Sequence, residues 1–138
     1  MPKQSSAKKI LSRQEQRNLD IEIGFIEGVI RRDPQYVEAL QILGDDYTRR
    51  GKFAEGLQVD ERLAQLRPDD SLVQYNLACS YALTEQFDAA VSALEKALNL
   101  GYRDFKWLAR DPDLVKLRKH PLYKKIRAQL KSLKTAKR

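Results

Sequence analysis

Few side chains in this sequence have the types and spacing that catalysis requires. His120 is the single histidine and stands directly before a proline, so no histidine-based triad or histidine-rich metal site can be assembled. Cys79 is the single cysteine and cannot form an intramolecular disulfide. Without a histidine partner it is expected to be a small, half-buried side chain. These residues predict structural roles, and we expect no enzymatic activity and no cofactor.

The acidic side chains offer one further possibility, a site for a hard cation. Asp45 and Asp46 are adjacent, and Asp111 and Asp113 are two residues apart, but the ligand ladder of an EF-hand is missing. Residues 44–52 lack the spacing and the Ser or Thr of a phosphate-binding loop. We therefore expect these acids to cap helices or to carry solvated charge, and we expect no metal.

The net charge of +7 is divided unevenly along the chain. Residues 1–13 carry +4, residues 14–113 carry −7 and residues 114–138 carry +10. The high pI thus belongs to the two ends, and the body between them is acidic. No secretory signal and no apolar run long enough to span a bilayer is visible, so we expect a cytoplasmic protein without a membrane span.

The elements that must position these side chains repeat with a period of 34 residues between positions 37 and 102. A shift of 34 places Leu43 on Leu77, Tyr47 on Tyr81, Phe53 on Phe87, Glu61 on Glu95, Leu66 on Leu100 and Asp70 on Asp104. A two-helix unit of this length cannot bury its own apolar face, so such units stack and present a continuous surface to another chain. The period predicts an all-α fold that binds a partner.

Capping signals and helical spacing divide the chain further. Ser12 followed by Glu15 predicts a capping box and a first helix within residues 12–33. Repeats are expected over 37–70 and 71–104, and capping helices over 105–134. Residues 1–11 and 135–138 are expected to be basic tails. In the first helix, Gly24 and Gly28 indicate close helix packing or simple tolerance rather than a membrane dimer motif.

The repeat has a recognisable pattern. Leu43, Gly44, Tyr47, Gly51, Phe53, Gly56, Leu66 and Pro68, followed by Tyr75, Asn76, Leu77, Ala78, Tyr81, Phe87, Ala90, Leu94, Ala97 and Leu100, resemble two consecutive tetratricopeptide (TPR) repeats. Residues 19–34 resemble the second helix of a preceding unit. Residues 104–123 are similar to a terminal segment that follows TPR units in many bacterial proteins. The resemblance implies an antiparallel α-α superhelix of about two and a half repeats with a helical C-terminal cap.

In TPR proteins the first helix of each pair lines a concave groove that contacts the partner, and the resemblance implies two sets of groove residues. The first-unit face would comprise Glu38, Gln41, Asp45 and Arg49, and the second-unit face Leu72, Tyr75, Asn76, Cys79 and Leu83. Exposed apolar side chains there would favour binding of a partner peptide or helix. The alternative is that the capping segment or a neighbouring helix covers them.

Some TPR domains also bind a partner's C-terminal carboxylate through a clamp of basic and amide side chains. Asn76, Lys106 and Arg110 match clamp positions, but Gln41 and Asp45 replace its first Lys and Asn. Because Asp45 would repel a carboxylate, this mode is disfavoured.

The basic C-terminus supports a rival function. The last helix combines an apolar stripe, suited to docking on the repeats, with five cations, Lys124, Lys125, Arg127, Lys131 and Lys134. These cations could bind nucleic acid, anionic lipid or an acidic protein, or they could be a solvated helix face. Self-association, in which the acidic body of one copy meets the basic end of another, is a third alternative.

Overall fold

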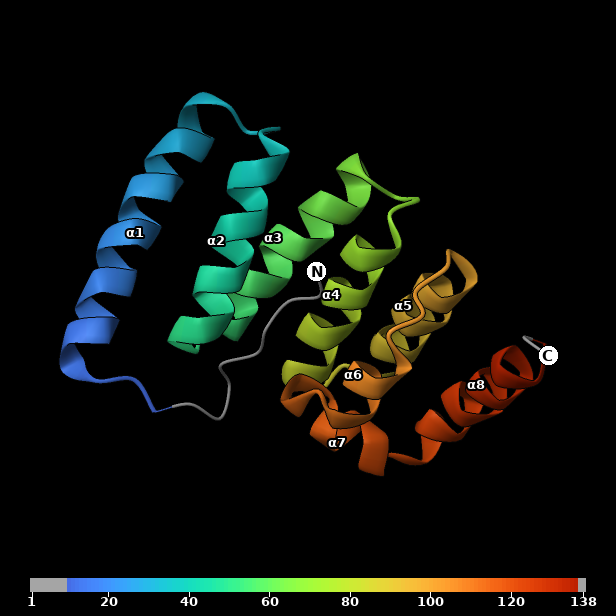
Figure 1. The fold of residues 1–138 in the computed structure, drawn as a ribbon. Helices are drawn as coiled ribbons and strands as arrows, with labels where there is room; N and C mark the ends of the chain where they lie inside the picture. The colour runs from blue at the N-terminus through green and yellow to red at the C-terminus, as the bar shows by residue number, and fades with distance from the viewer. Residues whose placement is uncertain (1–9, 137–138) are drawn as a thin grey trace.

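The structure is a computed structural model that describes residues 10–136, and within this range every regular element is a helix. The elements, coloured in chain order in Figure 1, are α1 (Arg13–Arg32), α2 (Val37–Arg50), α3 (Phe53–Leu66), α4 (Ser71–Leu83), α5 (Phe87–Asn99), α6 (Phe105–Arg110), the 3-10 turn η1 (Pro112–Leu114), α7 (Val115–Lys119), the 3-10 turn η2 (Pro121–Tyr123) and α8 (Lys124–Ala136). The predicted all-α fold is confirmed.

Helix α1 begins where the capping box predicts. The Ser12 hydroxyl accepts a hydrogen bond from the Glu15 amide at 3.1 Å, and the Glu15 carboxylate accepts one from the Ser12 amide at 2.9 Å. Two backbone donors of the first turn are thereby satisfied. The helix ends at Arg32, before Asp33 and Pro34.

Successive helices pack as antiparallel neighbours, and one hydrogen bond shows how they correspond. The Tyr47 hydroxyl on α2 donates to Glu27 on α1, and the Tyr81 hydroxyl on α4 donates to Glu61 on α3 at 3.0 Å. Donors and acceptors are each 34 residues apart. Helix α1 therefore packs against α2 in the same way as α3 packs against α4. Since α3 is the second helix of its repeat, α1 corresponds to the second helix of an incomplete unit.

Close approach between helices depends on two small residues of the first repeat. A Cβ at Gly44 would lie 3.1 Å from an Asp60 oxygen, and one at Gly56 would lie 3.3 Å from the Thr48 hydroxyl. Asp60 is buried and accepts a hydrogen bond from Ser80. A polar contact thus joins α3 to α4 at this position.

The segment after Gly101 forms the predicted cap. Its short helices begin at side-chain caps: Asp104 accepts from the Trp107 amide, Asp111 from the Asp113 amide and His120 from the Leu122 amide. Ile126 of α8 is fully buried, and Leu122, Leu130 and Leu133 pack against the same core, so the apolar stripe docks as predicted.

The expected tails fall partly outside the described residues. Residues 1–9 and 137–138 lie beyond the described range, so the N-terminal prediction can be followed only at Ile10 and Leu11. At the other end, α8 continues to Ala136, so positions 135 and 136 are helical rather than part of a tail. Between residues 10 and 136, no helix has the length and apolar character required to cross a membrane.

Candidate functional site

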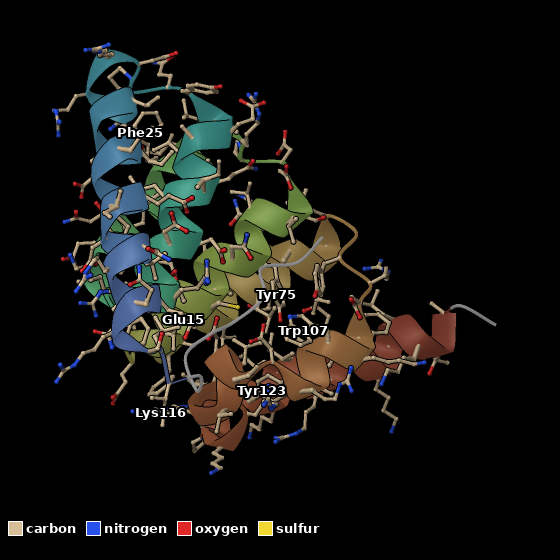
Figure 2. All side chains as sticks on the ribbon, turned by 60° about the vertical axis from the view of Figure 1, so that its left-hand side comes forward. Glu15, Phe25, Tyr75, Trp107, Lys116 and Tyr123 are labelled. Atoms are coloured by element: carbon tan, nitrogen blue, oxygen red, sulfur yellow. The ribbon has the colours of Figure 1, made fainter. Side chains whose placement is uncertain are left out.

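The second-unit face is covered by the chain's own cap. Tyr75 and Cys79 on α4 have no exposed surface. The Tyr75 hydroxyl donates to Asp111 Oδ2 at 2.6 Å, and the Cys79 thiol lies 3.6 Å from the same oxygen. The Tyr75 ring stacks on Tyr102 with centroids 4.2 Å apart. Figure 2 shows Tyr75 where α4 meets the capping helices. The prediction that Tyr75 and Cys79 contact a partner is therefore wrong, because the covering chain is internal.

Burial also sets the chemistry of these two side chains. Desolvation, reinforced by Cys79 and Asp111, raises the pKa of Tyr75 far above its usual value, so its hydroxyl stays protonated as a hydrogen-bond donor. Cys79 is fully buried, whereas the sequence suggested a half-buried side chain. Both residues hold the cap onto α4.

The rest of the second-unit face lies at the edge of the cap. Leu72, Asn76 and Leu83 keep part of their surface exposed. Among residues 10–136, Asn76 Oδ1 is buried without a hydrogen-bond partner. These three residues border the covered region and do not form an open apolar wall.

The first-unit face remains open. Glu38 and Gln41 are exposed, the Arg49 side chain is 37% exposed and Asp45 is half-buried. Ile42, which was not among the predicted groove residues, is 45% exposed on the same face. The sequence spacing could have predicted this position, because residues 38, 42, 45 and 49 are separated by four, three and four residues and so share one helical face. The first-unit face is thus mainly polar, with Ile42 as a large apolar side chain near its middle.

Asp46, adjacent to this face, points into the protein. It is 2% exposed and lies near Glu22 of α1 and Arg49, whose Nη1 is 3.9 Å from Asp46 Oδ1. Burial, together with Glu22 and Asp45, raises the pKa of Asp46 to about 8, while Arg49 opposes the shift. Asp46 is therefore neither the N-cap nor the solvated charge that the sequence suggested.

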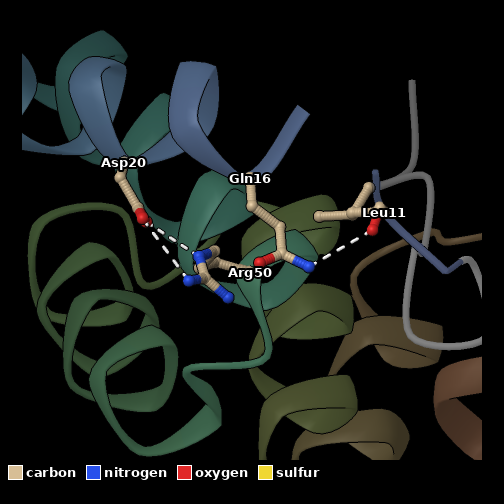
Figure 3. Close-up of polar contacts among 4 residues, drawn as sticks. All are labelled: Leu11, Gln16, Asp20 and Arg50. Atoms are coloured by element: carbon tan, nitrogen blue, oxygen red, sulfur yellow. Dashed lines mark hydrogen bonds and ion pairs between the residues drawn. The ribbon is translucent and has the colours of Figure 1, made fainter. Parts of the chain in front are cut away.

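An ion pair ties α1 to α2 at the other edge of this interface. Arg50 Nε lies 2.8 Å from Asp20 Oδ1, and Gln16 donates to the Leu11 carbonyl at 3.2 Å (Figure 3). The hydrogen bond from Arg50 lowers the pKa of Asp20. The ion pair joins the N-terminal half of α1 to the end of α2, and the Gln16 hydrogen bond holds the residues that precede α1 against its first turns.

Within the described residues, Cys79, Asp111 and Asp113 come close enough to suggest a metal cluster, with ligand atoms within 4.8 Å of one another. All three are buried. The Asp111 carboxylate already accepts from Tyr75, Cys79 and the Asp113 amide. This cluster is the hydrogen-bonded joint between α4 and η1.

The cations of α8 lie on its outer surface. All five predicted anion-binding residues, Lys124, Lys125, Arg127, Lys131 and Lys134, are exposed. Arg127 lies over the Tyr123 ring at 5.0 Å, and Lys134 over the Phe105 ring at 5.7 Å. A hollow of about 380 Å³ is lined by Arg127, Leu130, Lys131, Lys134 and Thr135. An anion could reach these cations without displacing the core.

Comparison with known proteins supports the repeat architecture. No protein-family model matches the chain. It is 42% identical over 79 residues to a chloroplastic protein of Arabidopsis thaliana, covering 55% of this chain and 24% of that protein. It is 31% identical over 90 residues to the peroxisomal targeting signal receptor of Komagataella phaffii, covering 64% of this chain and 16% of the receptor. The Candida albicans receptor is 35% identical over 77 residues, covering 55% of this chain and 13% of the receptor.

The chain thus spans a quarter or less of the length of these relatives. The fold defines an all-α helical repeat superhelix, and the similarity to the targeting signal receptors supports a TPR-like helical protein.

Proposed function

We propose that this chain is a non-enzymatic cytoplasmic scaffold module that binds a peptide or helix of a protein partner on its first-unit face. The observation that carries the proposal is Ile42, a large apolar side chain that is 45% exposed on the first-unit face. A large apolar side chain stabilises a complex when the partner buries it inside a rim of polar residues. The relatives named as targeting signal receptors are consistent with a protein partner.

The charges of the first-unit face define the partner's chemistry. Glu38 and Asp45 flank Ile42, and residues 14–113 carry a net charge of −7. We therefore expect a segment with one apolar side chain for Ile42 and basic side chains around it. A C-terminal carboxylate is disfavoured, because Asp45 stands where a clamp needs a donor.

A pair of matched isoleucine substitutions tests this function. Ile42→Asp places a charge in the groove, whereas Ile10→Asp makes the same chemical change at a position that is 94% exposed and lies before α1. Partner recovery from native cell extract should be lost with Ile42→Asp and kept with Ile10→Asp, with unchanged helical circular dichroism in both. Equal recovery by both variants would overturn the proposal.

The exposed cations and hollow of α8 favour a second candidate function, binding of an anionic partner such as nucleic acid, anionic lipid or an acidic protein. Binding of this kind depends on counterion release and weakens steeply with salt. A triple variant with Lys124, Lys125 and Lys131 changed to Gln should lose retention on heparin. A control with Lys52, Arg62 and Arg67 changed to Gln alters exposed cations of the repeats and should keep it.

RNA and vesicles containing anionic lipid, tested separately, would distinguish the source of the anion. Retention that is equal for both triple variants would reject a role for α8.

A further inference from the structure

Within residues 10–136, helix α1 has one face with no helix packed against it. It corresponds to α3, whose residues Gly56, Val59 and Leu63 are buried. The residues 34 positions earlier are Glu22, Phe25 and Val29. Phe25 is 69% exposed, whereas its counterpart Val59 is 8% exposed. The place where the first helix of a complete unit would pack is therefore open.

This face combines a protruding side chain with a hollow beside it. Ile21, Gly24, Phe25 and Gly28 follow the i, i+3, i+4, i+7 spacing that outlines one patch of a helix surface. Ile21 is 66% exposed. A Cβ at Gly24 would meet no atom within 4 Å, whereas one at Gly28 would lie 3.5 Å from the Arg31 guanidinium. The hollow has a volume of about 670 Å³ and is lined by Gly24, Phe25, Gly28, Val29, Arg31, Arg32, Asp33 and Tyr36.

The first nine residues of the sequence lack the pattern of a helix with an apolar face. Residues 1–9, MPKQSSAKK, contain no row of large apolar side chains at helical spacing. The occupant must bring an apolar protrusion to fill the hollow and a depression to receive Phe25. The α1 face itself has both features, so it is complementary to a copy of itself related by a two-fold axis.

We propose that a second copy of this chain docks on α1, with the two α1 helices antiparallel and each Phe25 inserted over Gly24 of the partner copy. α1 forms one end of the row of helices in Figure 1, and Figure 2 shows Phe25 on this helix, so a second copy can approach. An antiparallel pair also brings Glu22 of one copy, which is exposed although its carboxylate lies near Asp46 of the same chain, beside the half of the other α1 that carries Arg31 and Arg32.

Two substitutions distinguish an effect on dimer formation from an effect on the stability of the fold. Phe25→Asp removes the protrusion. Gly24→Gln fills the hollow, and since a Cβ at Gly24 meets no atom within 4 Å, the variant should fold with a more stable α1. Ile42→Asp and Ile10→Asp are controls away from the α1 face and should leave dimer formation unchanged. Failure of the dimer proposal can therefore be distinguished from failure of the proposed partner binding at Ile42.

The test is analytical ultracentrifugation of the full chain over a concentration series. The wild type should form a dimer that persists in high salt, while Phe25→Asp and Gly24→Gln should each raise the dissociation constant about tenfold or more. Gly24→Gln should do so without lowering the thermal midpoint. The proposal would be overturned by a monomeric wild type or by unchanged association in both variants. A dimer abolished by salt would also overturn it, because that result is expected for pairing of the acidic body of one copy with the basic end of another.

Discussion

At the scale of single residues, Asp111 decides which part of the groove is available. Its side chain accepts hydrogen bonds from Tyr75, Cys79 and the Asp113 amide, and its carbonyl accepts one from Arg118 at 3.0 Å. One buried acid therefore satisfies polar groups from α4 and from the cap. Nothing in the local sequence around Asp111 indicates that its partners on α4 lie more than thirty residues away.

Tyr75→Phe tests this joint. The variant keeps the ring stacked on Tyr102 but leaves an Asp111 oxygen without its hydroxyl donor. Removal of one partner of a buried polar pair should lower the free energy of unfolding by about 2 kcal/mol. Urea denaturation followed by circular dichroism measures the change. A variant as stable as the wild type would show that the hydrogen bond is dispensable.

Asp46 predicts a pH dependence of stability. Its pKa is about 8 in the folded chain, against an ordinary value of 3.8. At a pH between these two values, the Asp46 carboxyl near Glu22 is protonated in the folded state and ionised in the unfolded state. The free energy of unfolding should therefore fall as the pH rises from about 4 to about 8.

Asp46→Asn carries an amide that can donate to Glu22 at every pH. It should be more stable than the wild type by about 1–2 kcal/mol at pH 8 and about equal at pH 4. Urea denaturation at the two pH values measures the difference. An equal effect at both would contradict the assignment.

At the scale of elements, α1 is held by its ends and one buried face. Its N-terminus depends on the Ser12 capping box and its middle on the buried Leu19, Ile23 and Ile26. Its polar contacts with α2 are the Tyr47–Glu27 hydrogen bond and the Asp20–Arg50 ion pair. Because the exposed ion pair is worth little, the cap and the apolar face supply most of the stabilisation.

Ser12→Ala should lower the free energy of unfolding by about 1 kcal/mol, because the Glu15 amide loses its acceptor. Amide hydrogen exchange should show the loss confined to the first turns of α1. Ser92→Ala is a suitable control, since Ser92 is an exposed serine inside α5 rather than at a cap. Equal destabilisation by both variants would argue against the capping box.

At the scale of the whole molecule, the cap and the repeats share a core. A buried cluster runs from Tyr75 and Leu94 in the second repeat to Leu108, Leu114 and Ile126 in the cap. The cap should therefore open only when the second repeat unfolds.

Labelling of Cys79 by a thiol reagent measures this coupling, because the side chain is fully buried beneath the cap. Modification in buffer should be at least about a hundredfold slower than in denaturant and should accelerate in Tyr75→Phe. Rapid labelling of the native wild type would instead show that the cap lifts independently.

Much of the fold could be predicted from the sequence, because local signals carry it. The 34-residue period, the Ser12–Glu15 capping box and the spacing of Leu122, Ile126 and Leu130 correspond to the observed stack, the start of α1 and the docked last helix. Each signal depends on neighbours within a few residues or on repetition along the chain. The exposed cations of α8 were predictable for the same reason.

The candidate site was less predictable, because exposure depends on distant segments. Periodicity assigns Tyr75 and Cys79 to the same helical face as Leu72, but only the tertiary structure brings Asp111 onto them and removes them from solvent. Likewise, Phe25 stands 34 positions before the buried Val59, yet within residues 10–136 no helix packs against it. The sequence by itself determined the repeating helices and their apolar faces, since these follow from local periodicity. The tertiary structure decided which faces are covered, since burial depends on contacts between segments far apart in the chain.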